Sequence, residues 1–147
     1  MPQSTAATAA LLAVTVEACA GLGDMWVQTE HQAEHKGLHG EEKQVGQRAC
    51  AAHALTYTAT LAAGVGVINH AFRLGLRPSR MAAGLLLAGA THYVIDRREP
   101  LRKVAEAVNK GAFYRMSTPV SGSFELDQAA HRIFNTAAAF LMATGRR

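Results

Sequence analysis

The sequence predicts an all-α fold, in which residues 1–147 form one domain: a bundle of four antiparallel helices that we expect to span a membrane. Three observations predict it. Four long apolar runs are free of internal proline and rich in alanine and leucine, both strong helix formers. Only 18% of the residues are charged, below the roughly 25% of an ordinary soluble domain. The charged residues gather in the linkers between the runs.

The first run covers residues 5–28 and is interrupted only by the acidic residues Glu17 and Asp24. It is long enough to cross a bilayer, which takes about 20 mostly apolar residues. No Lys or Arg precedes Lys36, so the basic segment of a cleavable secretory signal is missing. We therefore expect this run to remain in the mature protein as the first helix.

The second run, residues 49–72, contains no Lys, Arg, Asp or Glu at all. A helix in a soluble bundle would need a polar stripe facing water, so this run favours the membrane over the alternative of a soluble, basic helical regulator. Small residues would allow membrane helices to approach closely. The candidates are Gly64 and Gly66 in this run and Gly84 and Gly89 in the third.

The third and fourth runs, residues 80–97 and 124–144, reach spanning length only when flanking residues are counted. Between them, residues 100–110 predict a short amphipathic helix that begins at Pro100 and stops before Gly111. Its apolar face would consist of Leu101, Val104, Ala105 and Val108. On a membrane protein, such a helix lies in the interface between lipid and water.

The first linker, residues 30–48, is polar and mixed in charge, and we expect a long solvated loop there. Histidines recur in it at every fourth residue, at His31, His35 and His39. Two glycines interrupt that stretch and argue against a helical metal-binding face. The two cysteines, Cys19 and Cys50, lie in apolar runs and are expected to be buried thiols.

Polar side chains gather near one end of every run. In an up-down-up-down bundle, the ends of the first and third helices meet the starts of the second and fourth. That end would carry Asp24 and Gln28, then His53, then His92 and Asp96, and finally Asp127, Gln128 and His131. Residues spaced i, i+4, such as His92 and Asp96, share a helix face. The sequence therefore predicts one polar cluster inside the bundle.

Imidazole and carboxylate groups that project inward from facing helices are how bundles build metal sites. We expect four residues to hold a divalent ion: His53, His92, Asp96 and His131. Asp24 or Asp127 would act as general base, and Gln28 and Gln128 would support the site. This donor set suits zinc, manganese or iron, and the sequence does not choose among them.

The hypothesis that follows is a metal-dependent hydrolase that acts on a lipid-linked or membrane-proximal substrate. One alternative stays open within the membrane class. The cluster would then be a structural hydrogen-bond network, or it would bind an ion or a partner without turnover. The chain contains no nucleophile motif, phosphate-binding loop or dinucleotide fingerprint that would favour another enzyme class.

As a set, these motifs resemble the domain of unknown function 3307 family of small bacterial membrane proteins. The family pattern is GD-x-x-x-Q near the end of helix one, a histidine opening helix two, TH-x-x-x-D in helix three and DQ-x-x-H opening helix four. The matching residues here are Gly23, Asp24 and Gln28; His53; Thr91, His92 and Asp96; and Asp127, Gln128 and His131.

The resemblance implies a protein with several membrane spans, but the family brings no established reaction. Its arrangement of intramembrane His and Asp is similar to that of membrane-bound metal-dependent hydrolases, which is an analogy. One position departs from the pattern. The family usually has a histidine one turn before the first aspartate, where this chain has Ala20. If that histidine is a ligand, this site has one ligand fewer.

The net charge of +4 is carried by Lys and Arg beside the apolar runs, a placement that suits lipid head groups rather than nucleic acid. Membrane lipids are therefore the expected partners, and a homo-oligomer is left open. The linkers at the clustered end contain more Lys and Arg than the opposite end. By the positive-inside rule, the chain would lie in the cell membrane with its cluster facing the cytoplasm.

Overall fold

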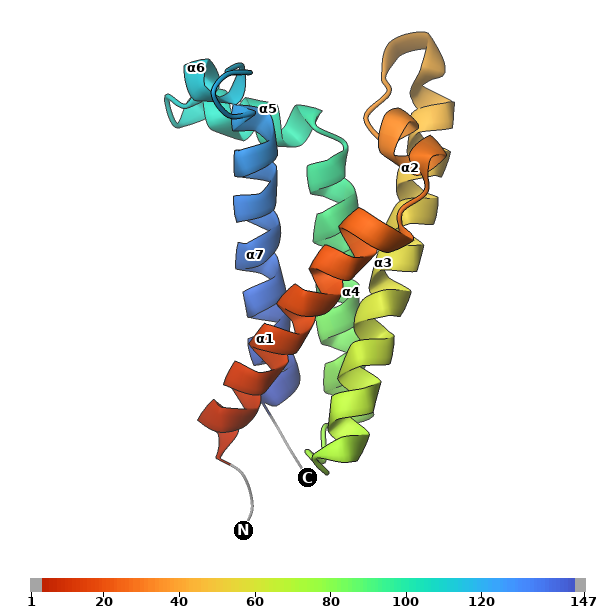
Figure 1. Cartoon of the computed structure of the whole chain (residues 1–147), viewed down its shortest axis with the longest axis vertical. Coiled ribbons are helices and arrows are strands. Elements are labelled where there is room, and N and C mark those ends of the chain that lie inside the picture. The colour runs from red at the N-terminus through yellow and green to blue at the C-terminus, as the bar shows by residue number, and fades with distance from the viewer. Residues whose placement is uncertain (1–3, 145–147) are drawn as a thin grey trace.

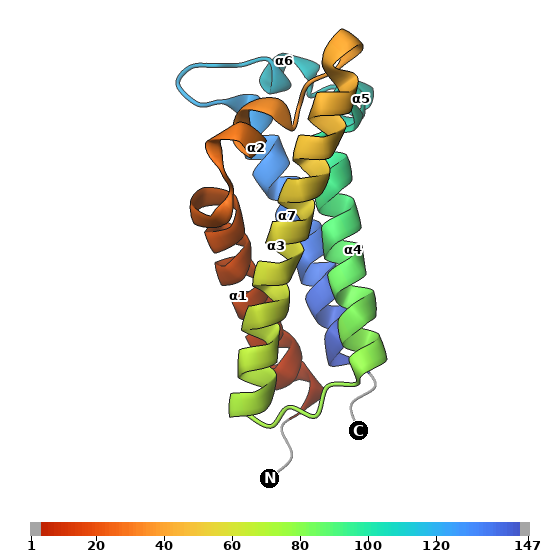
Figure 2. The ribbon, with the colours of Figure 1, turned by 90° about the vertical axis from the view of Figure 1, so that its right-hand side faces the viewer.

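Four long helices lie side by side in the computed structural model of the chain, which describes residues 4–144 (Figures 1 and 2). They are α1 (Thr5–Leu22), α3 (Lys43–Ala71), α4 (Pro78–Asp96) and α7 (Gly122–Ala143). Helix α1 packs against α3 and α7, and α4 packs against the same two helices. Successive long helices run in opposite directions (Figure 2). The described residues contain no strand, so the all-α prediction is confirmed.

The predicted number of helices is wrong, because the described residues form seven α-helices rather than five. The additional ones are α2 (Glu30–His35) and α6 (Gly111–Tyr114). Helix α2 lies in the linker that we expected to be a loop. It begins with a capping box, in which Thr29 Oγ1 accepts from the Gln32 N–H and Gln32 Oε1 accepts from the Thr29 N–H. This reciprocal pair stabilises a helix of only six residues.

The starts of the long helices follow from local chemistry. Ser4 Oγ accepts from the Ala7 N–H at 3.1 Å and caps α1, and Ser121 Oγ accepts from the Phe124 N–H at 3.4 Å and caps α7. Helix α4 begins at Pro78, which is tolerated in a first turn because that turn needs no N–H donor. Helix α3 begins before the predicted residue 49, directly after the 3-10 turn η2 (Gly40–Glu42).

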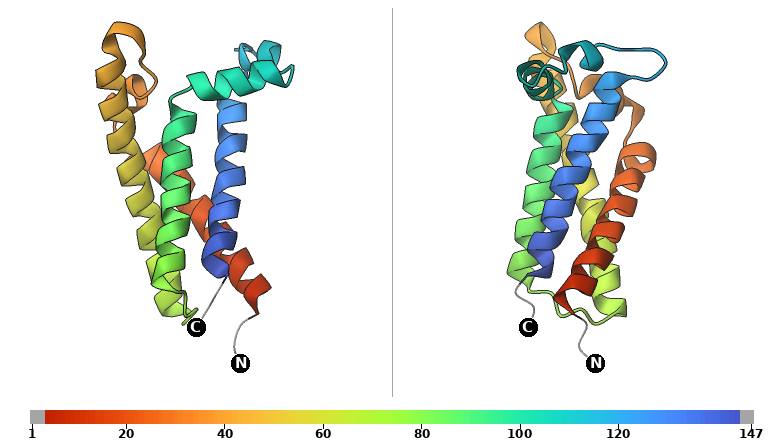
Figure 3. Two further views of the ribbon diagram at one scale, coloured as in Figure 1. Left: turned by 180° about the vertical axis from the view of Figure 1, so that it is seen from behind. Right: turned by 90° about the vertical axis from the view of Figure 1, so that its left-hand side faces the viewer.

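The predicted amphipathic helix is α5 (Glu99–Ala107), which lies with α6 across the ends of α4 and α7 (Figure 3). It ends before the predicted residue 110, and Gly111 begins α6 instead of following a single helix. Its apolar face is only partly covered: Ala105 is buried, whereas Val104 and Val108 are exposed. On its outer side, Lys103 Nζ lies 3.0 Å from Glu99 Oε1. The hydrogen bond from Lys103 and its positive charge hold the pKa of the Glu99 carboxyl below its ordinary value.

The apolar core occupies the half of the bundle that lies away from α5 and α6. Every long helix contributes to it, with Leu12 and Val16 from α1, Leu61 and Val65 from α3, Ala88 from α4, and Ala138, Ala139 and Met142 from α7. Leu74 and Leu76, between α3 and α4, close its lower end. Leucine and valine side chains fill much of this core, and the alanines between them let the helices lie close together.

Three of the four glycines expected at close helix contacts are found there. A Cβ at Gly64 would collide with Cys19 Sγ, one at Gly84 with the Met142 side chain, and one at Gly89 with Thr58 Oγ1. The prediction for Gly66 is wrong, because a Cβ at that position would meet nothing within 4 Å. Neither cysteine forms a disulfide, and Cys50 is buried while Cys19 is partly buried.

The outer surface of the long helices is apolar. Val14, Leu55, Leu86 and Ile133, one on each long helix, are each at least 66% exposed. Two helical segments are long and apolar enough to cross a membrane, Thr5–Val27 and Gly40–Ala71. Helices α4 and α7 are not among them.

Candidate metal centre

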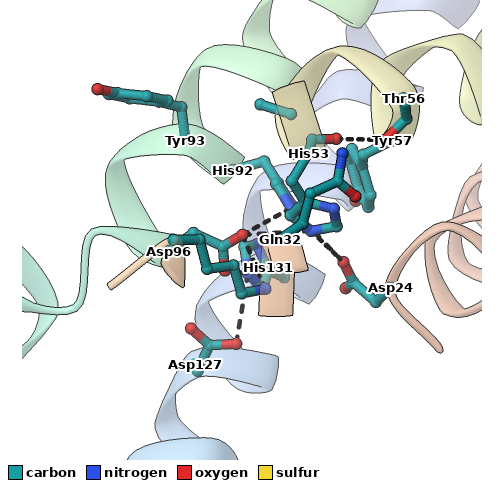
Figure 4. A network of polar contacts seen from close by, with 12 residues as sticks. Asp24, Gln32, His53, Thr56, Tyr57, His92, Tyr93, Asp96, Asp127 and His131 are labelled. Atoms are coloured by element: carbon teal, nitrogen blue, oxygen red, sulfur yellow. Dashed lines mark hydrogen bonds and ion pairs between the residues drawn. The ribbon is translucent and has the colours of Figure 1, made fainter. Parts of the chain in front are cut away.

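The polar residues predicted to meet do meet, at the end of the bundle where α5 and α6 lie (Figure 4). His53 comes from α3, His92 and Asp96 from α4, and Asp127 and His131 from α7. Asp24 comes from the π-helical turn η1 (Gly23–Val27), which continues α1. The three histidines and Asp96 are all buried. Side chains from four helical segments therefore converge on one buried point.

The centre of the cluster is the contact between His53 and His92, whose Nε2 atoms lie 2.9 Å apart. His53 Nε2 also lies 3.1 Å from Asp24 Oδ1 and 3.3 Å from Asp96 Oδ2. His92 Nε2 lies 3.1 Å from the same Asp96 oxygen and 3.5 Å from Asp24 Oδ1. Each of the two nitrogen atoms thus lies within 3.5 Å of the other and of both carboxylate oxygens.

Five separations within this group are close to those of a tetrahedral metal site. Zinc bound to histidine and carboxylate has bonds of about 2.0–2.2 Å, which places its ligand atoms about 3.3–3.6 Å apart. The two nitrogen atoms lie 2.9 Å from each other and 3.1–3.5 Å from the two carboxylate oxygens, so a small outward shift of the two rings would bring these pairs to the separations of a zinc site. His53, His92 and Asp96 form one of the three-residue groups of the described chain that could hold a metal ion.

Protons alone do not satisfy this arrangement. If both Nε2 atoms carried hydrogens toward the carboxylates, the hydrogens of His53 and His92 would be pressed together across 2.9 Å. If one Nε2 were unprotonated, it would accept a hydrogen bond from the other Nε2 at 2.9 Å, but its lone pair would also lie 3.1–3.5 Å from carboxylate oxygens. The Nδ1 atoms of both rings are also buried without a hydrogen-bond partner among the described residues. A cation bound by these atoms would remove the repulsion at Nε2, because the lone pairs and the carboxylates would then face a positive charge. It would leave the two Nδ1 groups without partners.

His131 and Asp127 lie on the other side of Asp96. His131 Nε2 is 3.6 Å from Asp96 Oδ1 and 3.4 Å from Asp127 Oδ2. This nitrogen is buried and makes no well-formed hydrogen bond within residues 4–144. The two oxygens of Asp96 therefore face different histidines, and Asp96, Asp127 and His131 form a second group that could hold an ion. Gln128 Nε2 donates to Asp127 Oδ2 at 3.4 Å.

Tyr57 separates the cluster from the apolar core. Its ring stacks on that of His92, with ring centres 3.7 Å apart, and His92 in turn stacks on His131 at 4.3 Å. The Tyr57 hydroxyl donates to Asn135 Oδ1 at 2.9 Å, in a fully buried contact. Such a stack fixes the ring planes of both histidines, as a preorganised site requires.

The π-helical turn explains how Asp24 reaches the cluster. The Gln28 N–H donates to the Gly23 carbonyl at 3.0 Å, a bond across five residues that widens the helix. Single π turns occur often at functional sites, because they redirect a side chain. Gly23 makes this turn possible: a Cβ there would lie 3.0 Å from Tyr57 Cδ2.

Lys36 lies at the outer edge of the cluster, with Nζ 3.0 Å from Asp96 Oδ2. The buried Arg97 holds the segment that carries it, since Nη1 donates to the Lys36 carbonyl at 2.7 Å and Nη2 to the Leu38 carbonyl at 2.6 Å. In the amide orientation that satisfies both of its groups, Gln28 Nε2 donates to the Asp24 carbonyl and Gln28 Oε1 accepts from Lys36 Nζ at 2.9 Å.

The sequence reasoning missed several members of this site. Tyr57 and Asn135 each follow a predicted ligand, His53 or His131, by four residues, and that spacing could have identified them. Nothing in the sequence identifies Lys36, because its position depends on tertiary contacts of Arg97. The first-linker histidines stay outside the cluster. His31 and His35 stack on each other in α2, and His39 Nε2 contacts the Arg97 carbonyl.

Comparison with known proteins adds no assignment, because no protein-family model, no curated protein and no solved structure gives a significant match.

Proposed function

We propose that this chain is an integral membrane protein that binds a divalent metal ion and catalyses hydrolysis at one face of the membrane. The observation that carries the proposal is the pair of Nε2 atoms of His53 and His92, 2.9 Å apart and flanked by two carboxylates. The family resemblance, which the comparisons leave as a proposal, is consistent with this function.

The distribution of apolar and charged residues supports the membrane part of the proposal. The four long helices present exposed Val, Leu and Ile outward. Charged residues are sparse along their middles and concentrate in residues 30–48, 73–80 and 97–115. Trp26, beside the cluster, is 83% exposed, and a tryptophan at the end of an apolar helix is typical of a membrane interface. The cluster would then lie near the head groups.

The proposed roles differ from the sequence-based assignment for two residues, because Asp24 joins the metal ligands and His131 leaves them. His53, His92 and Asp96 form a group that could hold an ion, and Asp24 Oδ1 lies 3.1 Å from His53 Nε2 and 3.5 Å from His92 Nε2, so we assign Asp24 to metal binding rather than to proton transfer. His131 and Asp127 face the outer oxygen of Asp96, where Asp127 could take a proton from an attacking water and His131 could orient it. Ala20 lies in the apolar core, and the proposed set of four ligands needs no residue at that position.

A divalent ion held by His53, His92 and Asp96, with Asp24 as a weaker fourth ligand that water can replace, would supply Lewis acidity and a nucleophile at neutral pH. The chain itself contributes rigidity, because Tyr57 fixes His92 by stacking and Arg97 fixes the segment over the cluster. Burial of His53 and Asp96 excludes bulk water and strengthens every electrostatic contact in the site.

The test is metal content of the protein purified in detergent, stripped with chelator and then dialysed against zinc, manganese or iron. We expect one bound equivalent for wild type and less than about a tenth of that for His92→Ala, because loss of a ligand leaves an incomplete tetrahedral site. The matched control is His70→Ala, since His70 is exposed at the opposite end of α3.

Two further measurements keep this test decisive. Circular dichroism shows whether the His92→Ala protein has folded. If it has not, the Asp24→Asn variant takes its place, because this substitution removes a charge with almost no change in side-chain size. Cobalt loaded in place of zinc would give the intense visible absorption of a four-coordinate site. Wild-type protein that retains no metal, or His92→Ala and Asp24→Asn proteins that both retain as much as wild type, would disprove the metal site.

A second function is favoured by one specific contact, the ion pair of Lys36 with Asp96 at 3.0 Å. In that case the positive charge of Lys36 balances the negative charge of Asp96, and the cluster is a structural network that catalyses no reaction. The two functions differ in the effect of metal on stability. A bound ligand stabilises the folded state in proportion to its occupancy, so zinc raises the unfolding temperature of wild type if the site binds metal. A structural network gives no such increase.

A further inference from the structure

A cavity of about 700 Å³ opens outward from the metal centre, beneath the loop between α6 and α7. This volume lies within the range of about 300–1,000 Å³ that is usual for small-molecule sites. Its inner end is formed by the carboxylates Asp24, Asp96 and Asp127. Its other lining residues come from η1, α2, α5, α6, the start of α7 and the segments that connect these elements. The cavity therefore connects the cluster to the surface.

Three cationic side chains line this cavity: Lys36, Arg98 and Arg115. The Arg98 guanidinium forms no ion pair within residues 4–144, and Arg115 has a single long contact with Glu106, at 3.6 Å. Arg98 is held in place by its stem, which lies against Gly37 so closely that a Cβ there would come within 2.7 Å of Arg98 Cδ. The Arg98 guanidinium, which has no carboxylate partner among these residues, is available to an anionic ligand, and the long contact of Arg115 leaves most of its donors available as well.

Hydroxyl groups add to this anion-binding character. Ser117 lines the same cavity from the segment before α7. Ser121 and Ser123 line it at the N-terminus of α7, where their hydroxyl oxygens lie 3.2 Å apart. That helix has 22 residues, and the aligned peptide dipoles of a helix favour negative charge at this end. Two guanidinium groups and several hydroxyl groups can donate more hydrogen bonds than one carboxylate can accept. A phosphate group has three oxygen atoms that accept such bonds.

The rim of the cavity is apolar. Met25 and Phe124 belong to the lining and are 56% and 48% exposed, and Leu101 and Met116 lie beside them. A purely polar substrate would gain nothing from this rim. A molecule with hydrocarbon chains attached to its anionic group would bury them against it.

We infer that the cavity binds the phosphate headgroup of a lipid phosphate monoester, with the phosphate between Arg98, Arg115 and the metal centre, and the hydrocarbon chains over Met25 and Phe124. This inference rests on the proposed function, whose substrate class it names. In the hydrolysis, the oxygen of water bonds to phosphorus, the ester P–O bond breaks, and the proton of water passes to the departing alcohol. The products are inorganic phosphate and a neutral lipid alcohol.

The test measures binding rather than turnover, by native mass spectrometry of the detergent-solubilised full chain at 4 °C. The probes are a phosphonate analogue of phosphatidic acid, which is not hydrolysed, and phosphatidylcholine of the same chains. Each is added to zinc-loaded and to metal-free protein. We expect the phosphonate to bind at least about tenfold more tightly than phosphatidylcholine, since a charge-assisted contact contributes about 1.5–3 kcal/mol.

The variants Arg98→Gln and Arg115→Gln keep the side-chain stem and remove the charge. We expect each to weaken phosphonate binding about tenfold, while Arg80→Gln, at the opposite end of the bundle, has no effect. Equal binding of phosphonate and phosphatidylcholine, or unchanged binding in both cavity variants, would overturn the inference.

Inorganic phosphate is the third probe, and it separates the two sources of the anionic group. We expect it to compete only at much higher concentration than the phosphonate lipid. Competition at equal concentration would overturn the lipid part of the inference. The metal content of each sample is measured in parallel: protein that binds zinc but does not discriminate between the lipids refutes only this inference. Protein that discriminates without ever binding zinc refutes the proposed function instead.

Discussion

Lys36 Nζ lies 3.0 Å from Asp96 Oδ2, the same carboxylate oxygen that faces the Nε2 atoms of His53 and His92. The ammonium group therefore neutralises the oxygen that a metal ion would bind. Two cations cannot share that close contact without strong repulsion. The relationship makes Lys36 either a competitor of the metal or a partner that moves toward the anionic ligand when the metal binds.

Replacement of Lys36 by methionine is predicted to tighten zinc binding about tenfold, because the competing positive charge is removed while the length of the side chain is kept. The metal-free protein should at the same time lose about 2 kcal/mol of stability, since Asp96 loses its charge-assisted contact. Competition with a fluorescent chelator measures the first effect and denaturation in detergent the second.

Lys43→Met is the control for this prediction, because Lys43 is exposed and makes no ion pair among the described residues. It should leave both quantities unchanged. Weaker zinc binding in Lys36→Met would show that Lys36 supports the site instead of competing with the metal.

The cluster could be predicted because its members stand near the ends of apolar helices, and antiparallel packing brings those ends together. His53 and His92 illustrate this, since helix order and direction suffice to make them neighbours. Lys36 could not be predicted. Its position depends on a guanidinium bridge from Arg97 to the Lys36 carbonyl, a contact between segments about 60 residues apart that no local pattern records.

The fold, like the cluster, could be predicted only in part. Four long helices follow from hydrophobic runs, whereas α2 was mistaken for a loop because polar composition outweighed the capping box of Thr29 and Gln32. The π turn that carries Asp24 could not be predicted from the sequence either, because the residues GDMWV fit an ordinary α-helix equally well. The direction of Asp24 is set by the approach of Gly23 to Tyr57, which is a tertiary contact.

Gly23→Ala is predicted to weaken metal binding by at least about tenfold and to destabilise the protein by about 1–3 kcal/mol. The added Cβ would lie 3.0 Å from Tyr57 Cδ2 and 3.5 Å from Tyr57 Cα, so it would force α1 away from α3 at the turn that positions Asp24. Equilibrium dialysis against zinc and denaturation in detergent measure the two effects.

Gly21→Ala provides a matched control two residues away. Its Cβ would meet nothing within 4 Å, so the higher helix propensity of alanine should stabilise α1 by up to about 1 kcal/mol. Identical behaviour of the two variants would show that the close approach at Gly23 does not position Asp24.

Tyr57→Phe is predicted to reduce stability by about 1 kcal/mol and to leave metal stoichiometry unchanged. The variant keeps the ring that stacks on His92 but removes the hydroxyl that donates to Asn135 Oδ1. Tyr57→Leu, which removes the stack as well, should also lower zinc affinity. Equal zinc affinity in the two variants would show that the stacked ring does not hold His92 in place.

The last prediction concerns the side of the membrane that the site faces. The segments around the cluster, residues 30–48 and 97–115, contain more Lys and Arg than the opposite end, and basic residues near spans favour the cytoplasm. Single cysteines at the exposed positions Glu41 and Ser79, in a Cys19→Ala, Cys50→Ala background, report on the two ends. We expect a membrane-impermeant maleimide to label Ser79→Cys but not Glu41→Cys in intact bacterial spheroplasts, and to label both after permeabilisation. Labelling of Glu41→Cys alone in intact cells would place the cavity, and its lipid phosphate substrate, on the outer face.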